Sequence, residues 1–230
     1  MFGLTPLEQE ALGLSLLVSG WAVAGSLPLG VLCAWVLARC DFPGKTLLDV
    51  LVHLPLVLPP VVVGYFLLVL LGRRGALGIW LHDWFGITVA FTWRGAAIAS
   101  AVIAFPLMVR AIRLALEGVD RGLEQVARTL GCGPVRTFFT VTLPLILPGV
   151  LAGVILAFAR SLSEFGATIT FVANIPGETR TLPIAIYALI QAPGGEEAVM
   201  RLCVISVAVA FAALLAAEVL SRRLQAGLRG

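Results

Sequence analysis

ALGLSLLVSGWAVAGSLPLGVLCAWVLA, residues 11–38, contains no charged side chain over 28 positions. The hydrocarbon core of a bilayer is about 30 Å thick, and a helix needs about 20 mostly apolar residues to cross it. This stretch is therefore long enough to span a membrane. The whole chain has the same character, because 60% of its 230 residues are hydrophobic and 13% are charged, against about 25% charged residues in soluble domains. The composition excludes a soluble globular protein.

Four further runs have the length and low charge of a membrane span, and they cover residues 50–71, 87–109, 137–159 and 202–220. Three of these runs contain one ionisable residue each: His53, Arg94 and Glu218. The runs lack the two-residue alternation of barrel strands, and only helices and closed barrels satisfy every backbone group in lipid. We therefore predict an all-α integral membrane protein with about five transmembrane helices, in a single transmembrane domain that covers residues 1–230.

Basic residues in the connections predict which side of the membrane each connection faces, because Lys and Arg favour the cytoplasm. With the N-terminus outside, ten basic residues fall inside and six outside. The ten are Arg39, Lys45, Arg110, Arg113, Arg121, Arg128, Arg136, Arg222, Arg223 and Arg229. The first residues also lack the basic region of a secretory signal, so we expect the first span to be retained. The count predicts an external N-terminus and a cytoplasmic C-terminus.

Two connections are too long and too patterned to be simple turns. Residues 110–137 alternate charged and apolar residues at roughly helical spacing, which predicts short amphipathic helices on the cytoplasmic face. Residues 160–201 contain several Gly and Pro residues between apolar stretches. This pattern predicts a broken, partly re-entrant segment that faces protein or a water-filled path, and the alternative is an ordinary external loop.

Small residues and prolines inside the spans predict two local features. Pro55, Pro59 and Pro60 remove helical hydrogen bonds from the second span, so we predict a kink there. Gly149 and Gly153 form a GxxxG pair in the fourth span, which indicates close helix packing rather than dimerisation through that face.

The sequence contains no constellation of catalytic or metal-ligating residues. His53 and His82 lie in different segments. The four cysteines have no CxxC spacing and are interpreted as small apolar side chains. The string PGKT at 43–46 ends like a phosphate-binding loop, but Arg39 stands where that loop needs its first glycine. We therefore expect a non-enzymatic chain without an ATP-binding motif, cofactor or metal, and the scattered basic residues argue against a nucleic-acid partner.

One cytoplasmic stretch carries a recognisable pattern. LEQVARTLG at 123–131 is followed, after nine residues, by VTLP at 141–144. This spacing resembles the EAA loop of ABC importer permeases, which has EAA, three residues, Gly, nine residues and then Ile-x-Leu-Pro. Gln125 and Val126 replace the Glu and the first Ala, whereas Ala127, Gly131, Leu143 and Pro144 match.

In that family the loop forms a coupling helix that docks into a groove on a separate ATP-hydrolysing subunit. The residues fit this role, because a helix over 123–130 presents an apolar ridge. We expect Gly131 to end that helix in a left-handed conformation and Pro144 to lie in the first turn of the next span.

Further segments resemble the permeases of molybdate ABC importers in particular. They are DFPGK at 41–45, HLPLVLPPVVVGY at 53–65, FPLMVR at 105–110, FARSLSEFGAT at 158–168 and IPGETRT at 175–181. Sulfate importer permeases share a looser form of several of them, so sulfate or thiosulfate is the alternative substrate. The resemblance implies a type I importer permease (MetI-like) fold in the plasma membrane of a bacterium, which is the inner membrane if the cell is Gram-negative.

The resemblance also implies partners. They are a second copy of the permease, two copies of an ABC ATPase subunit, and a periplasmic or extracellular molybdate-binding protein, all assembled in membrane lipid. The chain would form the path for molybdate, while the partner subunit hydrolyses ATP. A stand-alone ion-coupled carrier or a membrane enzyme is the alternative from another class, and it needs acidic or His residues inside the spans. Only Asp49, His53 and Glu164 come near that requirement.

Three groups of candidate site residues follow. The resemblance assigns ATPase coupling to Glu124, Gln125, Val126, Ala127, Arg128, Leu130 and Gly131. The path or gate is assigned to Ser161, Ser163, Glu164, Gly166, Thr168 and Thr170, because hydroxyl groups and exposed backbone near a helix break hydrogen-bond a tetrahedral oxyanion. Docking of the binding protein is assigned to Glu178, Thr179 and Arg180.

Two carboxylates in these groups have alternative roles. Glu164 repels a dianion, so we expect it to pair with Arg160, four residues earlier. Glu124 and Arg128 are also four residues apart, and the alternative for them is an ordinary surface ion pair.

Overall fold

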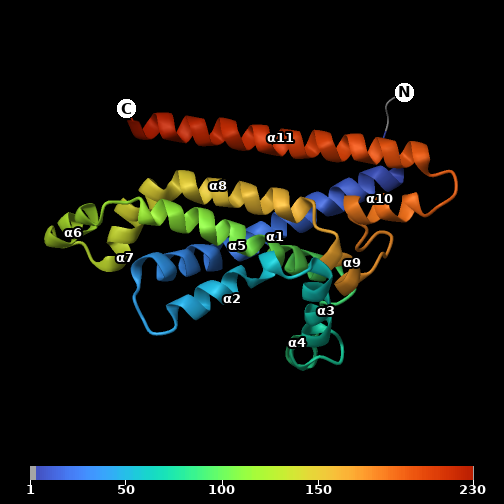
Figure 1. Ribbon diagram of the computed structural model, residues 1–230, viewed down its shortest axis with the longest axis horizontal. Helices are drawn as coiled ribbons and strands as arrows, with labels where there is room; N and C mark the ends of the chain where they lie inside the picture. Colours follow the sequence, from blue (N-terminus) through green and yellow to red (C-terminus); the bar gives the residue numbers. More distant parts are fainter. Residues whose placement is uncertain (1–3, 230) are drawn as a thin grey trace.

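The computed structural model describes residues 4–229, apart from the side chains of Ala217 and of residues 220–229. Every regular element in this range is a helix (Figure 1). The helices are α1 (Pro6–Arg39), α2 (Lys45–Val57), α3 (Pro60–Leu71), α4 (Ala76–Phe85), α5 (Trp93–Glu117), α6 (Arg121–Thr129), α7 (Pro134–Thr137), the π-helical turn η1 (Phe138–Thr142), α8 (Leu143–Leu162), α9 (Gly166–Val172), α10 (Leu182–Ile190) and α11 (Glu196–Arg229). The predicted all-α fold is confirmed.

Four of these segments are long and apolar enough to cross a membrane: α1, α5, the continuous helix Pro134–Leu162, and Glu196–Ala216 of α11. The bent pair of α2 and α3 makes a fifth if it counts as one span. The prediction of about five spans is therefore confirmed. The orientation of the termini stays a prediction, and the side chains of Arg222, Arg223 and Arg229, which entered the charge count, lie outside the described residues.

The predicted start of the third span, at residue 87, is too early, because the helix begins at Trp93. Residues 87–92 are not helical, and α5 begins at Trp93 because the Thr92 hydroxyl accepts a hydrogen bond from Gly95 N at 3.3 Å. Such an N-terminal cap satisfies a backbone donor that has no partner inside the helix. At its other end α5 continues to Glu117, beyond the predicted limit at 109. The hydropathy run stops at 109 because the last two turns of the helix contain charged residues.

The predicted kink of the second span is confirmed, and it is large. Helices α2 and α3 meet at 113°. Leu58 ends α2 in an extended conformation, which the following Pro59 favours, and Pro60 opens α3. The chain therefore changes direction between two separate helices instead of bending within one.

Pro144 lies in the first turn of α8 as predicted, but no loop precedes that turn. The helix runs without interruption from Pro134, through the wide turn η1, into α8. Pro144 has no backbone N–H to donate to the preceding turn, and a π-helical turn directly before it relieves the clash that a proline causes inside an α-helix. The fourth span therefore starts three residues before its predicted limit at 137.

Helix α5 lies at the centre of the bundle, with α1 and α8 packed against it (Figure 1). The closest approach to α8 is at two glycines. A Cβ atom on Gly149 would lie 2.2 Å from the Cβ of Ala115, and one on Gly153 would lie 3.1 Å from the Met108 carbonyl oxygen. This bears out the GxxxG interpretation, because these glycines bring two helices of the same chain together.

Helix α11 lies along one side of the bundle (Figure 1) and leaves large apolar side chains exposed, among them Met200, Val204, Val207 and Phe211. In water such a surface would be costly. In a bilayer it contacts lipid chains, which agrees with α11 as the outermost span.

We expect Gly149→Ala to lower the stability of the folded bundle, because the new methyl group meets Ala115 on a rigid neighbouring helix. Overpacking of this kind costs about 1–3 kcal/mol. Gly20→Ala is the matched control, because nothing lies within 4 Å of the added carbon and alanine has the higher helix propensity. Thermal unfolding of the purified variants checks this, and equal melting temperatures for both would contradict the packing described.

Candidate functional site

Helix α6 is closed at both ends by hydrogen bonds that its own sequence supplies. At the start, Gly122 N donates to Asp120 Oδ1 at 2.8 Å. At the end, Gly131 has a φ of 85°, Gly131 N donates to the Arg128 carbonyl at 3.0 Å, and Cys132 N donates to the Ala127 carbonyl at 3.1 Å. These two bonds form a Schellman motif. The predicted left-handed ending at Gly131 is confirmed, and the helix lies within two residues of its predicted limits.

Helix α6 has an apolar face and, on the opposite side, a polar and charged face. Leu123, Val126 and Leu130 recur every three or four residues, and they expose 48%, 58% and 79% of their surface. Arg121, Glu124, Gln125 and Arg128 follow the same spacing on the other side of the helix. Ala127 is buried at the edge of the apolar face. The exposed apolar ridge indicates a surface that another protein covers.

Residues from two other helices hold Glu124. Its Oε1 accepts from Arg39 Nη2 at 3.1 Å, where α1 ends, and from Thr142 Oγ1 at 2.9 Å, in η1. Arg39 Nη2 also donates to the Val119 carbonyl at 3.4 Å. The Arg39 side chain exposes only 9% of its surface, so salt screens this ion pair weakly. Through Glu124, α6 is fixed to α1 and to the base of α8.

The alternative surface pair between Glu124 and Arg128 is wrong. Within the described part of the chain, Glu124 is paired with Arg39, which lies 85 positions away. An exposed pair four residues apart contributes only about 0.2–0.5 kcal/mol, whereas the buried pair gains a second hydrogen bond from Thr142. Arg39 and Thr142 are site residues that the sequence analysis missed.

The predicted pair of Arg160 and Glu164 is confirmed at the break between α8 and α9. Glu164 Oε2 lies 2.8 Å from Arg160 Nη1, and Oε1 accepts from Ala167 N at 2.8 Å. The Glu164 carboxylate is buried, so it both neutralises Arg160 and caps the first turn of α9. Both oxygens of the Glu164 carboxylate are bound within the protein, so its charge does not face a bound anion.

Most of the predicted path hydroxyls are engaged with the backbone. They donate to carbonyl groups three or four residues earlier, at 2.8 to 3.1 Å: Thr168 to Phe165, Thr170 to Gly166, and Ser163 to Arg160. Among the described residues, Ser161 Oγ is buried without a hydrogen-bond partner. In this conformation Ser161 is therefore the hydroxyl of the group that makes no hydrogen bond, and it is buried.

The break after α8 meets the break in the second span. A Cβ atom on Gly64 of α3 would lie 2.5 Å from the Ala167 carbonyl oxygen, and one on Gly166 would lie 2.9 Å from Pro60 Cβ. Helices α3 and α9 therefore approach backbone to backbone, side by side in Figure 1. The sequence indicated both breaks, but it carried no signal that they touch.

The predicted docking residues lie on one turn between α9 and α10. Glu178 Oε1 accepts from Trp93 N at 3.3 Å, and Arg180 Nε donates to Asn174 Oδ1 at 2.8 Å. Thr179 is fully buried, and its hydroxyl accepts from Ile175 N at 2.9 Å and donates to the Ala173 carbonyl at 3.0 Å. Thr179 shapes the turn, while Glu178 and Arg180 are half-buried at its surface.

Helix α1 anchors the segment that contains this turn. Ser15 Oγ accepts from Leu182 N at 2.7 Å, and Glu10 accepts from Gly177 N. Glu8, which is buried, pairs with Arg201 of α11 at 3.0 Å. Between α8 and α11 the chain is broken into the short helices α9 and α10, and whether this segment is re-entrant stays a prediction.

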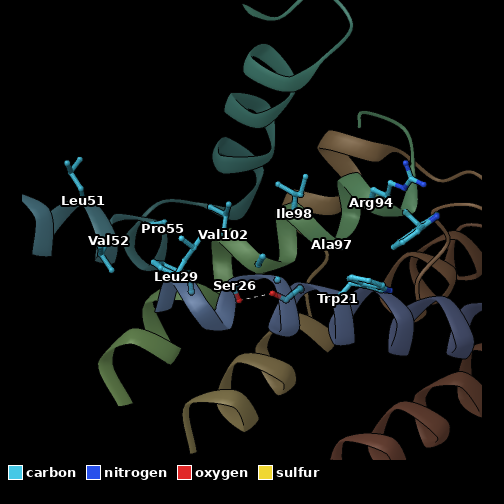
Figure 2. Close-up of a pocket in the computed structure, with 15 residues that line it drawn as sticks. Trp21, Ser26, Leu29, Leu51, Val52, Pro55, Arg94, Ala97, Ile98 and Val102 are labelled. Carbon is cyan, nitrogen blue, oxygen red and sulfur yellow. Dashed lines mark hydrogen bonds between the residues drawn. The ribbon is translucent and has the colours of Figure 1, made fainter. Parts of the chain in front are cut away.

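A cleft of about 980 Å³ lies between α1, α2 and α5. Figure 2 shows Arg94 and Trp21 towards one end and Leu51 and Val52 towards the other. Its walls are apolar apart from Arg94, which lies 5.7 Å over the Trp93 ring, and Ser26, which donates to the Ala22 carbonyl at 2.7 Å. None of the predicted site residues lines this cleft.

A bundle of apolar helices with broken spans and an exposed amphipathic helix at one end defines a membrane transport component. The chain belongs to the family of binding-protein-dependent transport system inner membrane components, whose model matches residues 26–226. This places it in a bacterial inner membrane, in agreement with the predicted localisation.

Individual relatives cover nearly the whole chain. It is 67% identical to the molybdenum transport system permease protein ModB of Escherichia coli over 219 residues, which are 95% of this chain and 96% of that protein. The ModB of Haemophilus influenzae is 57% identical over the same shares. The sulfate transport system permease protein CysT of Escherichia coli is 42% identical over 70% of this chain and 58% of that protein.

Solved structures show the same fold at low sequence identity. A bacterial ABC transporter that imports the polysaccharide alginate matches with a TM-score of 0.76 and 18% identity, over 96% of this chain and 80% of that chain. The MetNI methionine ABC transporter, in an inward-facing conformation, matches with a TM-score of 0.69 and 16% identity, over 95% of this chain and 94% of that chain. The predicted importer permease fold is confirmed.

We expect Glu124→Ala to destabilise the packing of α6, because it leaves the Arg39 guanidinium buried without a counter-ion. Breaking a buried pair in this way costs on the order of 3 kcal/mol. Thr142→Val removes one hydrogen bond to the same carboxylate, and we expect a smaller loss. Gln125→Ala, at an exposed neighbouring position, is the control. Protease accessibility of residues 118–133 reports the effect, and an unchanged Glu124→Ala digest would show that the pair does not hold α6.

Proposed function

We propose that the chain forms the translocation path for molybdate in an ABC importer, driven by ATP hydrolysis on a separate subunit. The observation that carries this is the 67% identity with a molybdenum transport system permease over 95% of the chain. The sulfate permease is less similar and matches a shorter part, 42% over 70% of the chain. Molybdate is therefore favoured over sulfate as the substrate.

The assembly contains two copies of this chain, two ATPase subunits and an external molybdate-binding protein. One solved relative is an alginate ABC transporter in complex with a periplasmic protein that carries the bound saccharide, which supports a partner of this kind. The broken α2–α3 span and the α8–α9 break give one wall of a path, and a second copy supplies the other wall.

Coupling to ATP hydrolysis runs through α6. The ridge of Leu123, Val126 and Leu130 docks against the ATPase, since apolar helix faces bind in apolar grooves. On its other face, Glu124 connects α6 to Arg39 and Thr142. A displacement of α6 by the ATPase therefore moves α1 and α8 together, and Gly131 fixes the turn that joins α6 to the next helix.

The gate lies where α3 and α9 touch. Gly64 and Gly166 allow two backbones to meet there, so a small separation of the helices opens the contact. Glu164 keeps α9 capped while it moves, and Ser161 offers a free hydroxyl beside the break. On the outer side, Glu178 and Arg180 present the turn to the binding protein.

Uptake of radiolabelled molybdate tests this proposal. The chain is expressed with its ATPase and binding protein in cells that lack their own transporter. We expect uptake that falls with excess tungstate and survives excess sulfate. Uptake blocked by sulfate would instead assign the chain to sulfate importers, and uptake that persists without the ATPase would overturn the ABC mechanism.

Val126→Asp and Leu130→Asp should reduce molybdate uptake at least tenfold, because each places a charge on the apolar ridge. Both positions are more than half exposed, so insertion and folding of the chain remain intact. Thr129→Asp adds the same charge to α6 beside the ridge and is the control. Copurification of the ATPase with each variant is measured beside uptake, and undiminished copurification of Val126→Asp would show that the ridge is not the docking surface.

A further inference from the structure

A second pocket, of about 720 Å³, lies between the end of α1, α6 and η1. Leu32 and Trp35 of α1 and Phe139 of η1 form an apolar wall. Arg39, Arg121 and Arg128 line the pocket at its charged end, together with Glu124. The pocket therefore combines a basic end with an apolar wall.

Among the residues that line the pocket, the charges at this end are not balanced: there are three guanidinium groups and one carboxylate, and Glu124 is already bonded to Arg39 and Thr142. The Asp41 carboxylate also acts on Arg121 from outside the lining, but it is paired with Lys45 at 2.9 Å. Arg121 has a single long hydrogen bond of 3.5 Å to the Ala38 carbonyl. Arg128 has no hydrogen bond or ion pair among the described residues, and Arg39 Nε is buried without an acceptor. The basic end thus attracts an anion.

The apolar wall selects among anions. A small inorganic anion gains nothing from Trp35 and Phe139. The wall continues along α1 through Val31 and Pro28, away from the charged end of the helix and towards the middle of the span. A molecule with an anionic head and an apolar tail fits both parts. Basic pockets between spans on the cytoplasmic side bind the phosphate heads of anionic lipids.

The pocket leaves free the apolar ridge that the proposed function assigns to the ATPase, and it uses Glu124, Gln125 and Arg128 of the wider coupling group. Arg121, Glu124 and Arg128 lie on one face of α6, and the ridge of Leu123, Val126 and Leu130 lies on the opposite face. Both faces are therefore available at the same time.

We propose that this pocket binds an anionic phospholipid of the cytoplasmic leaflet. Arg121 and Arg128 hold its phosphate, and Trp35 and Phe139 contact one acyl chain. The bound lipid connects α6 to α1 beside the Arg39–Glu124 pair, so it stiffens the attachment of the coupling helix. The assignment to the cytoplasmic leaflet rests on the proposed function.

Native mass spectrometry of the permease alone tests the site, with phosphatidylglycerol, phosphatidylcholine and inorganic phosphate as separate probes. We expect wild-type protein to retain phosphatidylglycerol at least tenfold more than phosphatidylcholine. Arg121→Gln with Arg128→Gln should lose that preference, and Phe139→Ala should weaken retention of the lipid. Arg136→Gln is the matched control, because Arg136 is exposed in the same segment and does not line the pocket. Gel filtration confirms that each variant is folded.

Equal retention of both lipids by the wild type would overturn the proposal, as would an equal loss in the control variant. Binding of inorganic phosphate without lipid would show a free-anion site and also reject it. Because this assay uses neither molybdate nor the ATPase, its result is independent of the uptake experiment. Failure of uptake with intact lipid retention would reject the proposed function and leave the lipid site standing.

Discussion

In an apolar solvent, every backbone N–H and C=O group must find its partner inside the protein. This constraint explains both the long helices and the way each interruption is built. Glu164 accepts from the first free amide of α9, Thr179 bridges the turn that follows it, and Ser15 accepts from Leu182 at the start of α10. Side chains therefore supply partners for backbone groups that these interruptions leave without a helical partner.

Two contacts between distant parts of the chain are built in different ways. The α3–α9 contact combines a close backbone approach at Gly64 and Gly166 with a buried side-chain cluster that contains Val63, Phe171 and Val172. The attachment of α6, in contrast, depends on a charged pair and a hydroxyl from distant helices. The attachment of α6 is therefore made by an ion pair and a hydrogen bond, whereas α3 and α9 are held together by close apolar packing.

Features with a local cause were predictable from the sequence. Uncharged runs gave the spans, Gly131 gave the end of α6, and the four-residue spacing gave the Arg160–Glu164 pair. The missed features depend on contacts between distant residues. Arg39 is 85 positions from Glu124, so periodicity favoured the wrong partner, Arg128. Hydropathy likewise placed the start of α5 too early, because a cap by Thr92 and not the loss of apolar residues sets that boundary.

Glu8 and Arg201 join the first helix to the last, and Glu8 is buried. A ribosome makes these residues at opposite ends of synthesis, so the Glu8 carboxylate waits without its partner until α11 has been inserted. The two buried clusters around α5 contain no residue of α11, whereas the third includes Leu202 of that helix. The pair therefore forms last during synthesis, and a chain that ends before α11 keeps a buried carboxylate without this cationic partner.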